Sequence, residues 1–328
     1  MILSHKKHRK QEKGSALLVV LGLVAVIAGW ASSAAYEDML SLRRAENSLV
    51  ANKAELACLS ALSLIKQGLI QDAKDSQIDS LDEQWAQSAP PFPVDNGLVA
   101  GSIEDGNRYL NINDLINVQG KVNTTMLPVF QRLFTQLQLD PRLLDALVDW
   151  MDADSTPFGY AGAEDDSYFD KPYRVKNAAL DRFQELRMIQ GFDAATVQAL
   201  KGSLRVWQRR LGAFSRINVN TAQKEVLLAM FPLMNDADFQ ELMLNRPYKE
   251  LTTLQQATWA KGVKAQNMFS RLSVTSDVFI VKTHAIFGRA DRTEAFGLAR
   301  QGTKLTWLWR ERILWQAPTT SINKAGQP

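Results

Sequence analysis

The sequence predicts an α+β fold in which a long N-terminal helix and a small antiparallel sheet are interrupted by a large all-helical insertion. Residues 14–36 contain no charged side chain and predict a membrane-spanning helix. Residues 272–316 alternate apolar and polar side chains in three short runs, which is the pattern of β-strands. Residues 114–271 carry apolar side chains at three- and four-residue spacings, which is the pattern of amphipathic helices.

A basic leader, residues 1–14, precedes the apolar run. It holds five of the 38 Lys and Arg residues and one of the 35 Asp and Glu residues, so the rest of the chain is close to neutral. Positive charge on this flank indicates that the N-terminus lies in the cytoplasm and that the chain after Tyr36 lies outside. The remainder lacks the basic excess with which proteins bind a phosphate backbone, so we expect no nucleic-acid partner.

Residues 15–36 predict a transmembrane helix, because about 20 helical residues cross a hydrocarbon core about 30 Å thick. We expect this helix to be retained in the mature protein. The alternative is an ordinary secretory signal, cleaved after the small residues 31–35, that releases a soluble periplasmic protein.

Residues 37–75 continue the helical pattern outside the membrane. Leu42, Leu49 and Leu56 recur every seven residues, and after the apolar run no Gly or Pro precedes Gly68. One helix, half in lipid and half outside, is the simplest interpretation of this pattern.

Residues 76–113 predict a linker followed by the first β-hairpin of the sheet. The linker is polar and rich in Pro, and the hairpin signal is Asp105-Gly106 between two short β-like stretches. Residues 272–316 supply the C-terminal strands, and residues 317–328 are expected to form a flexible tail.

Signals of catalysis are sparse. The three histidines are His5, His8 and His284, and the chain contains no GxSxG, HExxH or P-loop motif. The single cysteine, Cys58, lies among leucines and is interpreted as an inert core side chain. We therefore expect that the chain is not an enzyme.

Residues 140–170 form an acidic stretch and are the strongest candidate for a binding site. They hold nine Asp and Glu residues against one basic residue, Arg142. Carboxylates this dense repel one another, and a hard cation such as Ca²⁺, which takes six to eight oxygen ligands, would offset the repulsion. The candidate ligands are Asp149, Asp152, Asp154, Glu164, Asp165 and Asp166. From the residues alone, a solvated acidic surface with Asp at turns and helix caps stays open as the alternative.

Residues 217–222, INVNTA, resemble the start of a helix-hairpin-helix unit, which keeps an envelope DNA-binding protein open as an alternative function. Such a unit needs a Gly-rich hairpin that lets backbone N–H groups approach a phosphate. The equivalent residues 231–236 contain no Gly and include an acidic side chain. We therefore interpret Asn220 and Thr221 as helix caps.

The N-terminus resembles the class III signal of type IV pilins and pseudopilins, through the Lys13-Gly14 junction and the run SALLV that follows it. Val19 stands where most relatives have Glu, and this points to type II secretion system protein K, a family of minor pseudopilins. The body of the chain is similar to this family in five stretches, residues 110–115, 147–154, 162–166, 185–187 and 217–222.

The resemblance implies that a prepilin peptidase cuts between Gly14 and Ser15 and methylates the new N-terminus. It implies a single-pass protein of the inner membrane, with a cytoplasmic N-terminus and a periplasmic body. The function would be to form or initiate the tip of the periplasmic pseudopilus in protein export across the outer membrane. The implied partners are other minor pseudopilins, the prepilin peptidase and the inner-membrane secretion platform.

The resemblance also implies a pilin-like domain whose helical insertion has two small bundle-like parts, SAM-like or helix-hairpin-helix-like, which we place at residues 114–212 and 213–271. Because the family's insertion binds calcium, the resemblance favours a structural Ca²⁺ ion on the acidic candidates. Val19 would mark a tip position. Glu at the fifth mature residue neutralises the N-terminal amine of the subunit above, a charge that is costly within lipid, and it is dispensable only where no subunit lies above.

Overall fold

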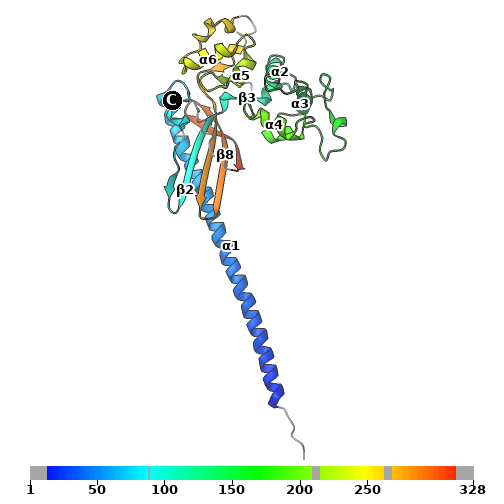
Figure 1. Ribbon diagram of the computed structural model, residues 1–328, viewed down its shortest axis with the longest axis vertical. Helices are drawn as coiled ribbons and strands as arrows, with labels where there is room; N and C mark the ends of the chain where they lie inside the picture. The colour runs from blue at the N-terminus through cyan, green and yellow to red at the C-terminus, as the bar shows by residue number, and fades with distance from the viewer. Residues whose placement is uncertain (1–12, 88, 209–214, 262–267, 315–328) are drawn as a thin grey trace, which may run out of the picture.

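The computed structural model describes residues 13–87, 89–208, 215–261 and 268–314. Figure 1 shows a long helix, α1, whose distal end packs against an antiparallel sheet, with the smaller helices gathered beyond the sheet. The fold is therefore α+β, as predicted. Most of the basic leader and the predicted tail, residues 317–328, lie outside the described residues.

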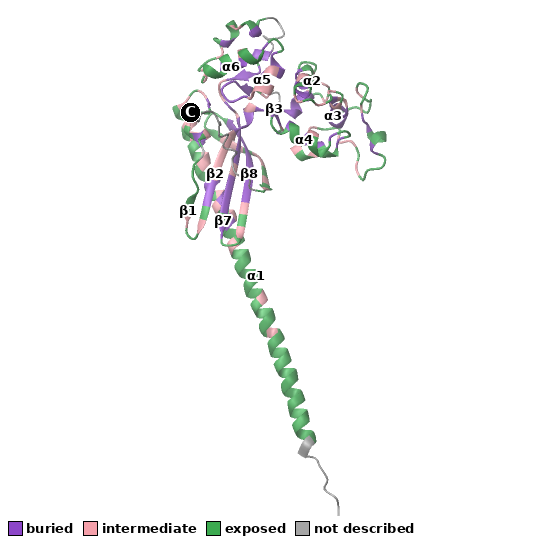
Figure 2. Cartoon of the chain, viewed as in Figure 1, coloured by how far each residue is buried: buried purple, intermediate pink, exposed green. Residues whose placement is uncertain are grey.

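The helix α1 spans Lys13–Asp75 without interruption, so the predicted membrane helix and its continuation form one element of 63 residues. The most apolar window of α1 has a mean hydropathy of 2.2, and none of the residues in this window is buried. By length and composition, α1 is the one candidate membrane span among the described residues. The proximal half is almost entirely exposed, whereas the distal half meets the sheet (Figure 2). Ala54, Cys58 and Leu62, spaced four residues apart, are buried at that contact.

The sheet has five antiparallel strands in the order β1-β2-β7-β8-β9. Their bounds are Phe92–Val94, Gly97–Asp105, Val278–Phe287, Ala290–Gln301 and Lys304–Ile313. The three C-terminal strands lie where the alternating pattern predicted them. Asp105 at the end of β2 is paired with Phe279 near the start of β7, so the chain leaves and re-enters the sheet at one place.

The first hairpin was predicted at the wrong dipeptide. The chain turns at Asp95, between Val94 and Gly97, and not at Asp105-Gly106. Glycine is required at position 106, directly after β2, because a Cβ there would lie 2.6 Å from Val278 Cγ1. The glycine of Asp105-Gly106 therefore marks a close approach of the backbone to β7 and not a turn. Both situations favour glycine because it has no side chain.

Between β2 and β7, five short α-helices lie wholly within the described residues, and they occupy the predicted helical segments. They are α2 Leu127–Gln136, α3 Leu143–Met151, α4 Ala194–Leu200, α5 Lys224–Met230 and α6 Asp236–Leu244. The described 3₁₀ helices of the chain are η1 Gln84–Ala86, η2 Gly106–Arg108, η3 Ile112–Leu115, η4 Asp165–Tyr168, η5 Phe183–Met188, η6 Leu254–Gln256 and η7 Thr258–Ala260.

The prediction that the block between β2 and β7 is all-helical is wrong, because the block contains two short strand pairs. Leu110–Asn111 (β3) pairs in parallel with Leu204–Arg205 (β4), and Ile217–Asn218 (β5) pairs in parallel with Leu272–Ser273 (β6). Each two-residue ladder joins segments that are distant in sequence, so neither leaves a periodic signal. Together they close two successive loops of the chain.

Three hydrophobic clusters stabilise the described part of the molecule. Two of them join α1 to the sheet, one through Leu62, Leu69, Trp85, Phe279, Val281, Phe296 and Leu298, and one through Ala54, Cys58, Ala61, Val99, Ala285 and Phe287. The third runs through the helical block and includes Phe130, Phe134, Leu147, Trp150 and Phe231. Burial of this apolar area is the main favourable term for all three.

Candidate metal centre

The acidic stretch is built on α3 and on the loop that follows it. Asp149 lies in the last turn of α3, Asp152 is the residue at which the helix ends, and Glu164 precedes the 3₁₀ helix η4. The loop between them returns to the helix because Tyr168 is buried and packs edge-on against Trp150, with ring centroids 5.6 Å apart. This aromatic anchor was missed from the sequence.

Three of the six predicted ligands converge. Asp149, Asp152 and Glu164 each place one carboxylate oxygen within 4.8 Å of the other two. Their exposed fractions are 0%, 4% and 9%. Within the described part of the chain none of the three forms an ion pair, so no basic side chain offsets the charge of these three buried carboxylates.

Asp149 fixes the path of the loop. Its two oxygens accept hydrogen bonds from the backbone N–H groups of Phe158 (2.8 Å) and Ala163 (2.6 Å). A Cβ on Gly162 would lie 2.6 Å from Asp149 Oδ2, so only glycine lets the loop pass this close to the carboxylate. The loop is thereby folded over the end of α3, where Asp152 and Glu164 meet.

Two buried oxygens of this group have no hydrogen-bond donor among the described residues. They are Asp152 Oδ1 and Glu164 Oε1. A buried carboxylate without a partner is strongly unfavourable, and buried charges are normally paired or coordinate metals. Carboxylate oxygens are also the ligands that hard cations such as Ca²⁺ take. The donor set therefore fits a hard divalent cation.

The pKa values of the three carboxyl groups are consistent with this uncompensated negative charge. Burial, followed by repulsion from the neighbouring carboxylates, raises the pKa of Asp152 to about 6 and that of Glu164 to about 7. Burial also raises the pKa of Asp149, although its two backbone hydrogen bonds oppose the shift. Near neutral pH these groups carry negative charge that only a cation or a proton can offset.

The other three predicted ligands lie outside the group. Asp154 accepts a hydrogen bond from Thr156 N (2.9 Å), and Asp165 accepts one from Val175 N (3.0 Å) and pairs with Arg174. Asp166 is exposed. These residues serve the loop locally, so the structure brings together half of the predicted set.

Asp145 also holds the loop, although the sequence pattern did not single it out. Its Oδ2 accepts hydrogen bonds from Tyr160 N and Ala161 N, both at 3.1 Å. The available signal was its spacing, because Asp145 and Asp149 are four residues apart and so share one face of α3.

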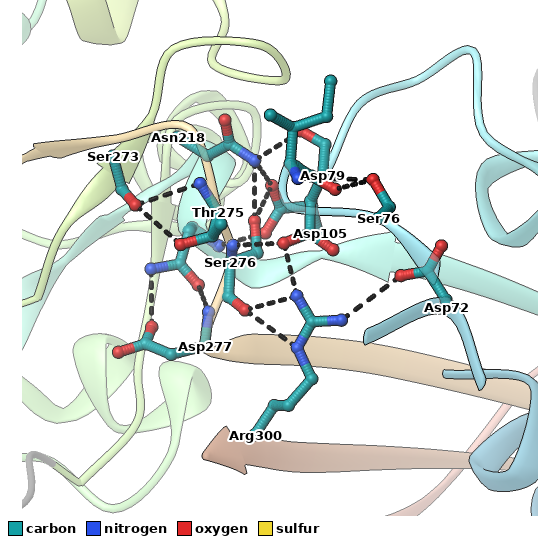
Figure 3. Close-up of polar contacts among 12 residues, drawn as sticks. Asp72, Ser76, Asp79, Asp105, Asn218, Ser273, Thr275, Ser276, Asp277 and Arg300 are labelled. Carbon is teal, nitrogen blue, oxygen red and sulfur yellow. Dashed lines mark hydrogen bonds and ion pairs between the residues drawn. The ribbon is translucent and has the colours of Figure 1, made fainter. Parts of the chain in front are cut away.

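A second polar cluster lies where α1, the sheet and the helical block meet, and we call it the joint. It comprises Asp72, Asp79, Asp105, Asn107, Asn218, Thr221, Ser276, Asp277 and Arg300. Figure 3 shows most of these side chains converging from segments far apart in sequence. Asp105 accepts hydrogen bonds at its centre from Asn107 N (2.7 Å), Ser276 Oγ (2.6 Å), Asn218 Nδ2 (3.2 Å) and Thr221 Oγ1.

The interpretation of Asn220 and Thr221 as helix caps was wrong. Thr221 donates to Asp105 in the joint, and Asn220 exchanges two hydrogen bonds with the backbone of Tyr248 (2.7 and 2.9 Å). The residue that precedes α5 is Gln223, which makes no capping bond. The INVNTA stretch is buried and links the second part of the helical block to the sheet.

At the N-terminus, Gly14 lies within α1 and the side chain of Ser15 is exposed.

Comparison with known proteins matches the chain to one family. Residues 108–209 and 217–275 match the models described as Type II secretion system (T2SS), protein K. The two matches coincide with the two segments closed by the β3–β4 and β5–β6 ladders.

Curated relatives support the same comparison. A type II secretion system protein K from Pseudomonas aeruginosa is 31% identical over 69% of this chain and 70% of its own length. One from Pectobacterium carotovorum subsp. carotovorum is 30% identical over 92% of this chain and 97% of its own length. The fold is similar to a chain in the crystal structure of the GspK-GspI-GspJ complex from enterotoxigenic Escherichia coli, with a TM-score of 0.73 and 21% identity. That match covers 83% of this chain and all of the other.

Proposed function

The chain belongs to the type II secretion system protein K family, and we propose that it acts as a minor pseudopilin that forms or initiates the tip of the periplasmic pseudopilus. The role is structural and not catalytic. The observation that carries the proposal is the division of α1, whose proximal half is apolar and exposed while its distal half holds the sheet and the helical block. Such a helix needs lipid and partner helices around it.

The anchor is a single pass through the inner membrane, with the N-terminus in the cytoplasm and the body in the periplasm. The support is the one candidate membrane span in the described chain and the basic leader in front of it. The prepilin peptidase and the inner-membrane secretion platform are the partners that such an N-terminus would meet.

The helical block is an insertion into a pilin-like unit made of α1 and the sheet. The support is the direct pairing of β2 with β7. Because the end of β2 lies beside the start of β7, the whole block between them leaves the sheet and returns to it at one place. Its two parts are small SAM-like or helix-hairpin-helix-like bundles, placed at residues 114–212 and 213–271. The bulk of this head suits an end position, because it would crowd a repeating filament.

Partner helices are expected to contact a leucine stripe on α1, made of Leu42, Leu49 and Leu56. Their exposed fractions are 61%, 59% and 64%, although Ala54 and Cys58 on the same helix are fully buried against the sheet. The double substitution Leu49→Asp and Leu56→Asp should abolish copurification of the full-length chain with the other minor pseudopilins, because charges would enter an apolar helix contact.

The matched control for the stripe is Ser48→Asp, which adds the same charge at an exposed position about 100° around the helix from Leu49. It should leave copurification unchanged. If the leucine variants still copurified normally, the proposed assembly through α1 would be wrong.

Processing is expected between Gly14 and Ser15, so that the mature chain keeps its membrane helix. Mass spectrometry of the mature protein should find an N-terminal methylated Ser15. Gly14→Val should accumulate the uncut chain, because a side chain at this position would obstruct the peptidase. A mature start near Ala35 would instead show ordinary signal cleavage and remove the membrane anchor from the account.

A structural Ca²⁺ ion is held by Asp149, Asp152 and Glu164. The ion would supply the charge that three buried carboxylates lack, and it would bind the returning loop to the end of α3. Asp149 would orient the loop through its two backbone hydrogen bonds while facing the ion. Asp154, Asp165 and Asp166 are not assigned to the ion, because they lie outside the group.

A further inference from the structure

A second group of carboxylates lies at the C-terminal end of α1, apart from the acidic loop, and shares Asp72 and Asp79 with the joint. Asp72 is in the last turns of α1, and Asp79 and Glu83 follow in the segment that leads to η1. One carboxylate oxygen from each lies within 4.8 Å of the other two. The three carboxylates come from the pilin-like unit alone, although the backbone of Asp79 also contacts the helical block through Asn218.

Asp79 is the most constrained member of the cluster, with no exposed surface. Its Oδ2 accepts hydrogen bonds from Ser276 N (2.6 Å) and from Arg300 Nη2. Its Oδ1 is buried and has no donor among the described residues. An anionic oxygen left in this state is costly unless a cation or water reaches it.

The cluster carries more negative charge than its one basic partner offsets. Arg300 Nη1 lies 3.3 Å from Asp72 Oδ2, and the same guanidinium pairs with Asp79. Glu83 has no ion pair in the described chain; its Oε2 accepts from Ser80 N (2.8 Å) and Trp85 Nε1 (2.9 Å). Three carboxylates against one guanidinium leave two formal negative charges, the charge of one divalent cation.

Space for a hydrated ion adjoins the cluster. A cavity of about 430 Å³ is lined by Asp72 and Asp79 of the cluster and by Arg300, and Arg216 and Asp277 line it as well. It opens to solvent, so water can supply the ligands that the three carboxylates do not. Burial, followed by the Glu83 and Asp79 carboxylates, raises the pKa of Asp72 to about 6 despite the neighbouring guanidinium.

We propose that Asp72, Asp79 and Glu83 bind one hard divalent cation, with Ca²⁺ as the best fit, and that this ion fastens the end of α1 to the sheet. Oxygens that share one Ca²⁺ at 2.3–2.6 Å lie up to about 5 Å apart, which accommodates the observed separations. Arg300 on β8 donates hydrogen bonds to Oδ2 of Asp72 and to Oδ2 of Asp79. The ion and the guanidinium together would neutralise the cluster.

The test separates this site from the one in the acidic loop. The full-length mature chain is purified in detergent with Asp152→Ala and Glu164→Ala, which remove the loop site, and its Ca²⁺ binding is measured by equilibrium dialysis with radioactive calcium. The loop variant should still bind one ion per chain. Adding Glu83→Gln, which keeps an acceptor for Ser80 N and Trp85 Nε1, should weaken that binding by at least about tenfold.

The matched control is Asp82→Asn, which removes the same charge from the exposed neighbouring residue and should leave binding unchanged. If Glu83→Gln does not fold, Asp72→Asn replaces it, because Asp72 is the more exposed carboxylate in contact with Arg300. A folded loop variant that binds no Ca²⁺, or whose affinity Glu83→Gln leaves unaltered, would overturn the proposal. Either result would leave the acidic-loop site unaffected.

Discussion

Chelation of divalent cations is expected to lower the melting temperature of the full-length chain, and added Ca²⁺ is expected to restore it. A ligand that binds only the folded state stabilises it by about 2.7 kcal/mol at a hundredfold excess over Kd. In proteins of roughly 150–250 residues, each kcal/mol moves the melting temperature by about 2–4 °C. Scanning calorimetry of the detergent-purified chain, with and without chelator, measures the shift.

The Ca²⁺ site in the acidic loop should account for most of the change in melting temperature of the helical block. Asp152→Ala and Glu164→Ala should each reduce the recovery with Ca²⁺, because they remove the buried oxygens that have no hydrogen-bond donor among the described residues. Asp166→Ala is the matched control, since Asp166 is exposed and outside the ligand group. An unchanged melting curve in chelator, with no calcium found by elemental analysis, would contradict the calcium proposal.

The stabilisation by Ca²⁺ should also depend on pH. In the folded chain the pKa of Asp152 is raised to about 6 and that of Glu164 to about 7, above the ordinary value near 4. In chelator, the neutral carboxyls contribute stability below about pH 4, and this stability is lost as the pH rises through about 6 to 7. The difference between chelator and Ca²⁺ should therefore be larger at about pH 8 than at about pH 5.

Asp105→Ala is expected to destabilise the chain by about 4 kcal/mol or more. The carboxylate accepts four hydrogen bonds, from Asn107, Ser276, Asn218 and Thr221. Its removal leaves buried donors unsatisfied, at roughly 1–3 kcal/mol each. Because two of these donors belong to the INVNTA stretch, the helical block should also become more susceptible to protease where it meets the sheet.

Chemical unfolding of the Asp105 variant measures the loss, with limited proteolysis as the second readout. Asp82→Ala is the control, because exposed substitutions away from such contacts change stability by at most about 0.5 kcal/mol. Unfolding of the Asp105 variant at the midpoint of the unsubstituted chain would show that the joint does not hold the two parts together.

The elements that the sequence predicted well are those set by local pattern. The uninterrupted apolar and heptad-spaced residues up to Asp75 specify one helix, and the alternation after Asp277 specifies three strands. Both patterns are written within single segments, so they survive without knowledge of the rest of the chain. The two parallel ladders could not be found in this way, because Leu110 meets Leu204 and Ile217 meets Leu272 through two residues each.

The errors at Gly106 and Thr221 have a common cause. Each residue type carries two local meanings, a turn or a close approach for Gly, and a cap or a buried donor for Thr. Tertiary contacts with Val278 and Asp105 decide between them. Such contacts are absent from a local pattern.

The candidate site was predicted in part. Asp149 and Asp152 were identifiable from their position at the end of a helix, three residues apart on neighbouring turns. Which later carboxylate joins them depends on the path of the loop, which Asp145 and Asp149 fix through backbone N–H groups. The cluster at Asp72, which draws on the end of α1 and the segment after it, had no sequence signal of its own.

The position of the chain within assembled pseudopili tests the central proposal most directly. A photo-cross-linking amino acid at Leu49, on the exposed leucine stripe of α1, would report the neighbours of the mature chain in the cell. The proposal predicts cross-links to other minor pseudopilins and none between copies of this chain, because a tip subunit with Val19 has no subunit above it. Cross-links between successive copies along the pseudopilus shaft would contradict it.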